Sequence, residues 1–367
     1  MNQRERIMAA VRHQPVDRVP TDIWATAEVT QKLMDYFGIT EGGISSGGKV
    51  MADSTDTLIE LYDRLHIDGP VYLSPPYLGP ALRKEEDYSE NEWGMGFRDQ
   101  RYQGGIYSEQ VYYPLAKAET IADLEAFPWP DPDWYDYTAI PSLAARFDGR
   151  AICLGYTACF YFHNLLRGLE LSLMDPLLRP EFTHYLIQRL SDFFTEYHRR
   201  CYEAGKGSID LTQVTDDLGS QHGLLISPQV FDGFYRGAMQ RAIDQAHSYG
   251  ILVFHHDDGD CRRLLPSLVE MGIDLLNPVQ WRCGNWDLVT LKRDYGSRIC
   301  FHGAVDNQQT LPFGSPEDVR QEVRGLIETL ASDHTGFIIG PCHNLQAITP
   351  VENILALYEA AHEYGTF

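Results

Sequence analysis

The chain has 367 residues, of which 44% are hydrophobic and 22% are charged, and its formal net charge at pH 7 is −22. This acidic balance argues against a nucleic-acid partner, because phosphate binding depends on clustered Lys and Arg side chains. The chain shows neither an apolar run of about 18 residues nor a basic-then-apolar N-terminus, and its seven cysteines include no C-x-x-C pair, so we expect a cytoplasmic protein without a membrane partner.

The elements expected along the chain alternate between strands and helices. A helix within residues 1–18 precedes the first strand, and apolar runs bounded by turn residues predict strands at 19–24, 68–74, 151–156, 208–214, 251–256, 274–280, 298–305 and 336–341. Amphipathic segments predict helices at 175–204, 228–249, 261–271, 286–294, 316–332 and 350–364. Ser227 and Ser315 precede prolines and predict N-caps, and Gly250 and Gly272 mark helix ends. This order predicts an α/β fold, a (β/α)8 TIM barrel in a single domain over residues 1–367.

One segment departs from the alternation. Residues 93–115, WGMGFRDQRYQGGIYSEQVYYPL, predict an inserted hairpin around Gly104 and Gly105. Two interpretations stay open, a lid over a site and a surface hairpin with aromatic packing.

Polar residues gather at the expected ends of the strands, where barrels of this type carry their catalytic groups. They are Trp24, Asp68, Asp216, Asp217, His255, His256, Asp257, Asp258, Gln280, Trp281, His302, Asp306, Cys342 and His343. Several carboxylates at one mouth repel each other unless a cation or a proton lies between them. The convergence therefore predicts a functional site.

The stretch FHHDDGD, residues 254–260, carries the main metal hypothesis. On a continuing strand His256 and Asp258 face the same side, and a nitrogen with a carboxylate oxygen makes a workable zinc pair when a third ligand comes from another strand. Cys342 or His343 is the candidate for that ligand. The alternatives are that Asp258 or Asp260 caps the helix beginning near Cys261, that His255 packs on the opposite face, and that Asp216 and Asp217 hold a loop.

Five segments in the same order resemble the uroporphyrinogen decarboxylase superfamily, which includes the zinc-dependent methylcobamide methyltransferases and corrinoid-linked demethylation enzymes. They are RERIMAAVRHQPVDRVPTDIW, DDLGSQHGLLISPQVF, FHHDDGD with LVEMGIDLLNPVQ, FHGAVDNQQTLPFGSPEDVRQEV and IIGPCHNLQAITPVENILALYEAA. The resemblance implies a (β/α)8 barrel with its active site at the mouth. The haem-pathway decarboxylases carry an arginine segment of the form RQAGRY after the first strand. Here that place is WATAEVTQKLMDYF, without arginine, which argues against a substrate with many carboxylates.

The methyltransferase branch carries a zinc site of the form H-x-C-G and a cysteine after the last strand. The corresponding residues here, His256 to Gly259, read H-x-D-G, and counting back from Thr349 places His343 at the cysteine position, with Cys342 one residue earlier. The resemblance thus implies a zinc or other divalent ion on His256, Asp258 and one of Cys342 or His343. A ligand set of nitrogen and oxygen suits polarising an oxygen better than activating a soft thiol.

The implied activity is movement of a methyl group between a small methylated substrate and a corrinoid cofactor or protein, with metal assistance. The expected catalytic residues are His256, Asp258, His343 and Asp217, and the expected substrate-binding residues are Trp24, Asp68, Gln280, Trp281, His302 and Asp306. The sequence has no D-x-H-x-x-G corrinoid-binding segment, so cobalamin would arrive free or on a corrinoid protein. Two alternatives stay open, a metal-free decarboxylase of a smaller acid that uses Asp68, Asp217 and His343, and a non-catalytic partner in a corrinoid complex. The oligomeric state is open, with a homodimer among the expectations.

Overall fold

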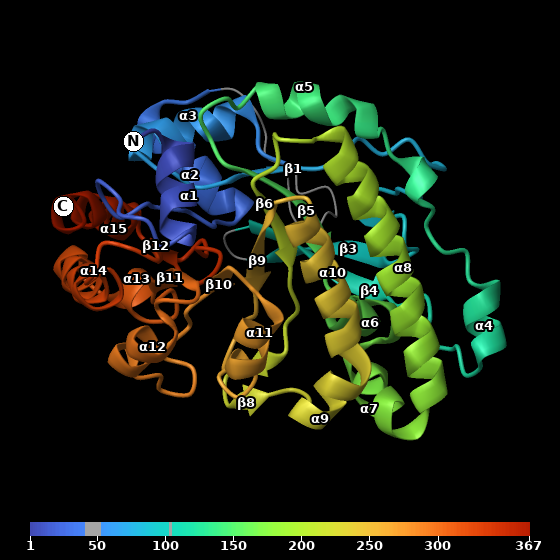
Figure 1. Ribbon diagram of the computed structural model, residues 1–367. Coiled ribbons are helices and arrows are strands. Elements are labelled where there is room, and N and C mark those ends of the chain that lie inside the picture. The colour runs from blue at the N-terminus through green and yellow to red at the C-terminus, as the bar shows by residue number, and fades with distance from the viewer. Residues whose placement is uncertain (41–52, 103–104) are drawn as a thin grey trace.

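A parallel sheet forms the centre of the protein, surrounded by helices (Figure 1). The computed structural model describes residues 1–40, 53–102 and 105–367. The sheet order is β1-β5-β6-β9-β10-β11-β12. The strands are β1 (Val71–Leu73), β5 (Ile152–Thr157), β6 (Leu211–Val214), β9 (Leu252–His256), β10 (Leu275–Asn277), β11 (Cys300–Val305) and β12 (Phe337–Pro341).

The segment predicted as the first strand, 19–24, is not a regular strand, but it closes the barrel. On one side Asp22 N–H donates to the Ile339 carbonyl and Ile339 N–H donates to the Pro20 carbonyl, both at 2.9 Å. On the other side the N–H groups of Asp68 and Gly69 donate to the Thr21 carbonyl at 3.0 and 2.9 Å. Pro20 has no N–H to donate, which limits the ladder to isolated bridges. The segment therefore takes the eighth position of the predicted barrel.

Helix α1 (Gln3–Val11) closes the end of the barrel where the strands begin. Its Ile7 and Ala10 pack in one buried cluster with inward-facing strand residues such as Cys153 and Leu211. Arg4 N–H donates to the Gly149 carbonyl just before β5. The predicted N-terminal helix is confirmed, and its position leaves the opposite end of the barrel open for a site.

The remaining helices lie outside the sheet, with α8 and α10 on one flank and α14 and α15 on the other (Figure 1). They are α2 (Ala27–Phe37), α3 (Asp56–Leu65), α4 (Ile121–Ala126), α5 (Ile140–Ala145), α6 (Cys159–Arg167), α7 (Leu169–Leu178), α8 (Pro180–Ala204), α9 (Pro228–Val230), α10 (Arg236–Ser248), α11 (Leu265–Met271), α12 (Leu288–Tyr295), α13 (Thr310–Phe313), α14 (Pro316–Leu330) and α15 (Val351–Tyr364). Among the described residues, two 3₁₀ turns, η1 (Pro132–Trp134) and η2 (Tyr137–Ala139), and a π-helical turn, η3 (Phe231–Tyr235), complete the set. None of the described helices combines the length and the apolar character needed to cross a membrane.

Proline and capping residues explain where several of these helices begin. The helix predicted at 175–204 is two helices, because Pro180 begins α8 directly after the end of α7 at Leu178. The Ser227 and Ser315 side chains accept from Val230 N–H and Asp318 N–H, so both predicted N-caps are confirmed. Gly272 ends α11 with φ at 100°, a conformation that glycine adopts without steric cost.

The inserted hairpin is confirmed as part of an antiparallel sheet of β2 (Tyr88–Glu90), β3 (Gly96–Tyr102) and β4 (Gly105–Tyr112). The predicted turn residue Gly104 lies outside the described residues. Gln110 Nε2 donates to the Leu165 carbonyl at 2.6 Å, and Ile106 N–H donates to Glu28 Oε1 at 3.0 Å. These bonds attach the hairpin to α6 and α2. A shorter hairpin, β7 (Gly219–Ser220) with β8 (Gly223–Leu224), follows β6.

Candidate metal centre and substrate cavity

Three side chains meet at the open end of the barrel. His256 is the last residue of β9, Asp258 follows two residues later, and His343 follows β12. His343 Nε2 lies 3.2 Å from Asp258 Oδ2, and His256 Nε2 lies 3.6 Å from Asp258 Oδ1. One ligand atom from each residue can be chosen so that all three lie within 4.8 Å of one another.

The donor set fits a divalent ion. Asp258 Oδ1 is buried and has no hydrogen-bond partner among the residues that the structure describes, which is costly for a carboxylate oxygen unless an ion contacts it. Two imidazole nitrogens and one carboxylate oxygen form a catalytic zinc set with a fourth position open to substrate, and tetrahedral ligand atoms on bonds of about 2.0–2.1 Å lie roughly 3.3 Å apart. The 3.2 and 3.6 Å separations involve different oxygens of Asp258, and one ligand atom from each residue lies within 4.8 Å of the other two. His256, Asp258 and His343 can therefore hold a metal once these atoms draw together by up to about 1.5 Å.

Cys342 does not join this group. Its side chain is buried, and its thiol donates to the Val279 carbonyl at 3.5 Å. Burial raises the pKa of the thiol well above its ordinary value, so it stays protonated. Of the two candidates left open by the sequence, the structure brings His343 to His256 and Asp258.

Asp217 lies beside the same histidine. Its Oδ1 is 3.7 Å from His256 Nε2 and accepts from Asp258 N–H at 3.5 Å. Burial raises the pKa of Asp217, and the neighbouring Asp258 charge adds to the rise although His256 opposes it. A carboxyl group with a raised pKa at this position can hold a proton next to the metal ligands.

The two histidines respond to their surroundings in opposite directions. Burial lowers the pKa of His256, but the carboxylates of Asp258 and Asp217 more than offset it, and the net pKa is raised. The pKa of His343 is lowered by burial and by the neighbouring His256. His343 therefore has the greater tendency to be neutral, which is the form that binds a metal.

Trp24, predicted to bind substrate, forms one wall of the centre. Its ring stacks on His256 with ring centres 5.0 Å apart and on Phe254 at 6.0 Å, and it meets the edge of His343 at 6.4 Å. Its Nε1–H donates to the Tyr72 hydroxyl at 3.3 Å. Trp24 thus connects the candidate metal centre with Tyr72.

Tyr72 lines a cavity of about 260 Å³ that lies between the strand ends, the inserted hairpin and α8. The aromatic side chains that line it are Tyr72, Tyr77, Trp93, Phe97, Tyr135, Tyr156, Phe162, Phe193, Phe194 and Tyr197. Burial raises the pKa of the Tyr156 phenol well above its ordinary value, and the Asp217 and Asp258 charges add to that rise. The contact between Trp24 and Tyr72 connects this cavity with the centre. The sequence prediction missed these lining residues, for which the only signal was the aromatic content of the hairpin.

A chain of buried hydrogen bonds supports His256 from inside the barrel. His256 Nδ1 and Asn277 Oδ1 are 2.5 Å apart, as are Asn277 Nδ2 and His302 Nδ1. His302 Nε2 contacts Asp22 Oδ2 at 2.9 Å. His302 was predicted to bind substrate, and the structure places it in the barrel interior with 2% of its surface exposed. Asn277 and Asp22 were missed. The sequence signal that could have found them is that each is a polar residue within an otherwise apolar predicted strand.

Asp68 lies at the other end of the barrel and not at the mouth. It precedes β1, is fully buried, and pairs with Arg6 and Arg18 at 2.6 Å each. The predicted strand began too early in this region, because residues 68–70 precede the first residue of β1, Val71. Asp68 fixes α1 to the base of the barrel.

Three further predicted residues hold loops around the mouth. Gln280 Oε1 accepts from Gly259 N–H at 2.7 Å, and Trp281 Nε1–H donates to the Ala304 carbonyl at 2.9 Å. The Asp306 carboxylate accepts from three successive N–H groups after β11 and pairs with Arg282 at 2.8 Å. Through these contacts, the three side chains stabilise the loops that surround the site.

The carboxylates of Asp257 and Asp216 accept hydrogen bonds from backbone N–H groups. Asp257 Oδ1 accepts from the N–H groups of Leu218 and Gly219, and Asp216 Oδ1 accepts from Tyr161 N–H. His255 Nδ1 donates to the Val214 carbonyl at 2.8 Å on the face opposite His256. The strand alternation predicted from FHHDDGD is therefore present, with His256 and Asp258 on the site.

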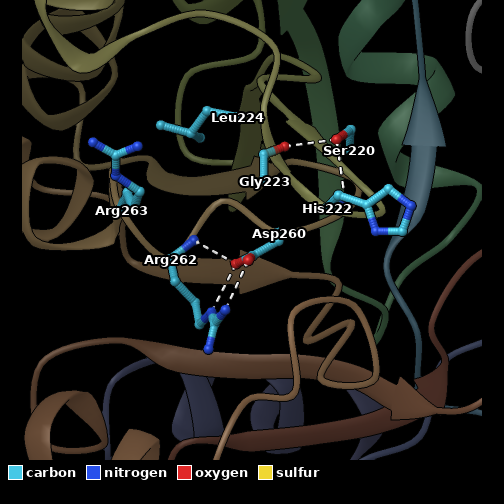
Figure 2. A pocket seen from close by; sticks show the side chains of 7 residues that line it. All are labelled: Ser220, His222, Gly223, Leu224, Asp260, Arg262 and Arg263. Carbon is cyan, nitrogen blue, oxygen red and sulfur yellow. Dashed lines mark hydrogen bonds and ion pairs between the residues drawn. The ribbon is translucent and has the colours of Figure 1, made fainter.

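A second cavity, of about 540 Å³, lies on the rim and contains none of the three metal-centre residues. It lies between the β7–β8 hairpin and the loop after β9 (Figure 2), and Arg262 is turned toward Asp260, with Nε at 2.7 Å from Oδ1. Asp260 also accepts from Arg262 N–H and Trp286 Nε1–H. α11 begins only at Leu265, so Asp260 holds the preceding loop instead of capping the helix.

A closed α/β barrel with ionisable side chains gathered at the carboxyl ends of its strands is the architecture of a barrel enzyme. The family model described as "Uroporphyrinogen decarboxylase (URO-D)" matches residues 111–364. The chain belongs to the uroporphyrinogen decarboxylase family, which confirms the resemblance.

Relatives cover nearly the whole chain at low identity. A uroporphyrinogen decarboxylase from Pseudomonas putida (strain GB-1) is 21% identical, covering 98% of this chain and 97% of its own. One from Vibrio campbellii is 20% identical over the same shares. Among solved structures, a methyltransferase from Methanosarcina mazei has a TM-score of 0.70 and 20% identity and covers 99% of both chains. This similarity confirms the predicted barrel fold.

Proposed function

We propose that the protein is a metal-assisted methyltransferase that moves a methyl group between a small methylated substrate and the cobalt of a corrinoid. The observation that carries the proposal is the group of His256, Asp258 and His343 around a buried carboxylate oxygen that has no hydrogen bond within the described part of the chain, next to an aromatic cavity. The methyltransferase from Methanosarcina mazei shares the fold. The absence of an arginine in WATAEVTQKLMDYF supports a substrate without many carboxylates.

In this reaction, separate residues would bind the ion and deliver the proton. Nε2 of His256, Nε2 of His343 and the Asp258 carboxylate would hold the ion, which when bound supplies a Lewis acid for the heteroatom that loses its methyl group. Asp217, whose pKa is raised by burial, would hold a proton and deliver it to that heteroatom. The methyl group leaves for cobalt without its bonding electrons, so the heteroatom keeps the pair and takes the proton.

The cavity favours a flat aromatic methyl donor. Phe97 from the hairpin and Phe193 and Tyr197 from α8 present rings on its sides, and aromatic rings stack or meet edge to face with a bound ring. Trp24 and Tyr72 would border the end of the ring that carries the methyl group. A phenyl methyl ether fits this lining better than an uncharged aliphatic donor.

The proposal is tested with purified protein, a cobalt(I) corrinoid, added zinc and a panel of methylated aromatic and aliphatic compounds. We expect methyl-cobalt formation, followed by absorbance, with aromatic methyl ethers. His256→Ala and Asp258→Ala should abolish it, and Cys342→Ser should not, since its thiol faces Val279. Failure of every donor to give methyl-cobalt would overturn the proposal.

A metal-free decarboxylase is the second candidate, favoured by the curated relatives that are named uroporphyrinogen decarboxylase. Because Asp68 lies at the base of the barrel, this reaction would rest on Asp217 and His343. Release of CO₂ from a small acid that continues undiminished in a chelator would support it over methyl transfer. A non-catalytic role would be favoured if corrinoid-protein binding survived the double change His256→Ala and Asp258→Ala and the wild type had no turnover.

A further inference from the structure

We infer that Asp22, His302 and Asn277 act as positioning residues that fix the tautomer of His256, so that its Nε2 lone pair faces the candidate metal centre. The inference deepens the proposed function, because it concerns the same centre. It states which atoms carry protons along one buried chain of hydrogen bonds, formed by Asp22, His302, Asn277 and His256. All four members are at most 9% exposed, so water offers them little alternative bonding.

The chain starts at a group that can only accept. The Asp22 carboxylate takes Ile23 N–H on Oδ1 at 2.8 Å and meets His302 Nε2 on Oδ2 at 2.9 Å. An ionised carboxylate has no proton to donate, so His302 must carry its proton on Nε2. In neutral His302 the other nitrogen, Nδ1, is then an acceptor.

The Asn277 side chain connects His302 to His256, and the proton position on His302 determines which end of the Asn277 amide faces each histidine. His302 Nδ1 as an acceptor requires the Nδ2 amide group of Asn277 on its side, and the two atoms are 2.5 Å apart. The amide oxygen then faces His256 Nδ1, also at 2.5 Å. Because that oxygen can only accept, His256 must carry a proton on Nδ1, and in the neutral ring Nε2 keeps its lone pair.

If the donor and acceptor roles along this chain were reversed, His256 could not bind a metal. A doubly protonated His302 would donate from Nδ1, turn the amide of Asn277 around and place its Nδ2 donor against His256 Nδ1. His256 would then carry its proton on Nε2, the atom 3.6 Å from Asp258, and could not bind an ion there. The orientation of one buried amide therefore decides whether His256 is a ligand.

Packing keeps Asp22 in place. Its N–H donates to the Ile339 carbonyl, and its own carbonyl accepts from the Tyr358 hydroxyl at 3.0 Å. A side chain at Gly69 would collide with the Asp22 carboxylate, and one at Gly340 would collide with the Asp22 carbonyl. Both neighbouring positions thus leave the space that Asp22 needs.

The direct test is ¹⁵N NMR of the histidine ring nitrogens in the metal-free wild type, at a pH where His256 is neutral. We expect a protonated Nε2 and an unprotonated Nδ1 on His302, and the reverse on His256. A protonated Nδ1 on His302, or an unprotonated Nδ1 on His256, would overturn the inference. This measurement requires neither a variant nor a methyl donor.

The second test is zinc affinity, measured by competition with a chromophoric chelator. Asn277→Leu and Asp22→Asn should weaken binding about ten- to a hundredfold, the usual effect of removing a group that orients a metal-binding histidine. Asn353→Leu is the matched control, because Asn353 is an equally buried amide that bonds to the Leu311 and Gly314 carbonyls on α13 and its end. Wild-type affinity in folded Asn277→Leu protein would contradict the inference. Tautomers as expected in a protein that transfers no methyl group would instead contradict only the proposed function.

Discussion

Replacing Asp258 by Asn should lower the pKa of His256. The substitution keeps the size of the side chain and removes the carboxylate charge 3.6 Å from His256 Nε2. That charge is first among the influences that raise the pKa of His256, and burial acts against it. With the charge gone, burial and the remaining Asp217 would set the pKa.

The magnitude follows from the distance and the exposure. Two unit charges about 3.6 Å apart interact by roughly 1 kcal/mol in water and by about 4–5 kcal/mol at an effective dielectric constant of 20. The Asp258 side chain is 36% exposed, so solvent screening favours the lower part of this range, about 1–2 kcal/mol, or roughly one pKa unit.

The assay is an NMR pH titration of the His256 ring in metal-free protein. Asp260→Asn serves as the control, because Asp260 is paired with Arg262 and does not contact His256; this variant should leave the titration unchanged. An unchanged or higher His256 pKa in Asp258→Asn would refute the electrostatic reasoning.

Three other outcomes are expected. His343→Ala should lose stoichiometric zinc in elemental analysis while Cys342→Ser retains it; equal zinc in both would contradict the ligand set. Asp68→Asn should lower the free energy of unfolding by about 3 kcal/mol in denaturant titrations, because it leaves the buried guanidinium of Arg6 without one of its partners, and a change below 1 kcal/mol would mean that the pair contributes little. Burial lowers the pKa of His255 to about 4, so the unfolded chain binds the extra proton between about pH 6.5 and pH 4. Stability from this group should fall by about 3 kcal/mol as the pH drops through that window, and His255→Gln should show a smaller fall; an equal fall would contradict the assignment.

The strand and helix pattern was readable from the sequence because it depends on local periodicity. Ser227 and Ser315 were recognised as caps for the same reason, and the alternation in FHHDDGD assigned His256 and Asp258 to one side. The segment 19–24 shows the limit of this reasoning. Its bonds to β12 and to residues 68–69 depend on closure of the barrel, and Pro20 interrupts the regular pattern.

The parts of the site that the sequence did not reveal are those built from distant segments. Cys342 and His343 are adjacent, and only the path of the chain after β12 decides that the imidazole turns to Asp258. The contact between Asp22 and His302 joins residues 280 positions apart. The aromatic cavity likewise combines the hairpin with α8.

The most direct test of the account is the single-turnover rate of methyl transfer to cobalt(I) cobalamin, measured before and after metal removal with an aromatic methyl ether as donor. The account predicts that the metal-stripped wild type is inactive, that zinc restores the rate, and that zinc restores nothing in His256→Ala. Methyl transfer that continues unchanged in the stripped protein, or in His256→Ala, would contradict a metal centre formed by His256, Asp258 and His343.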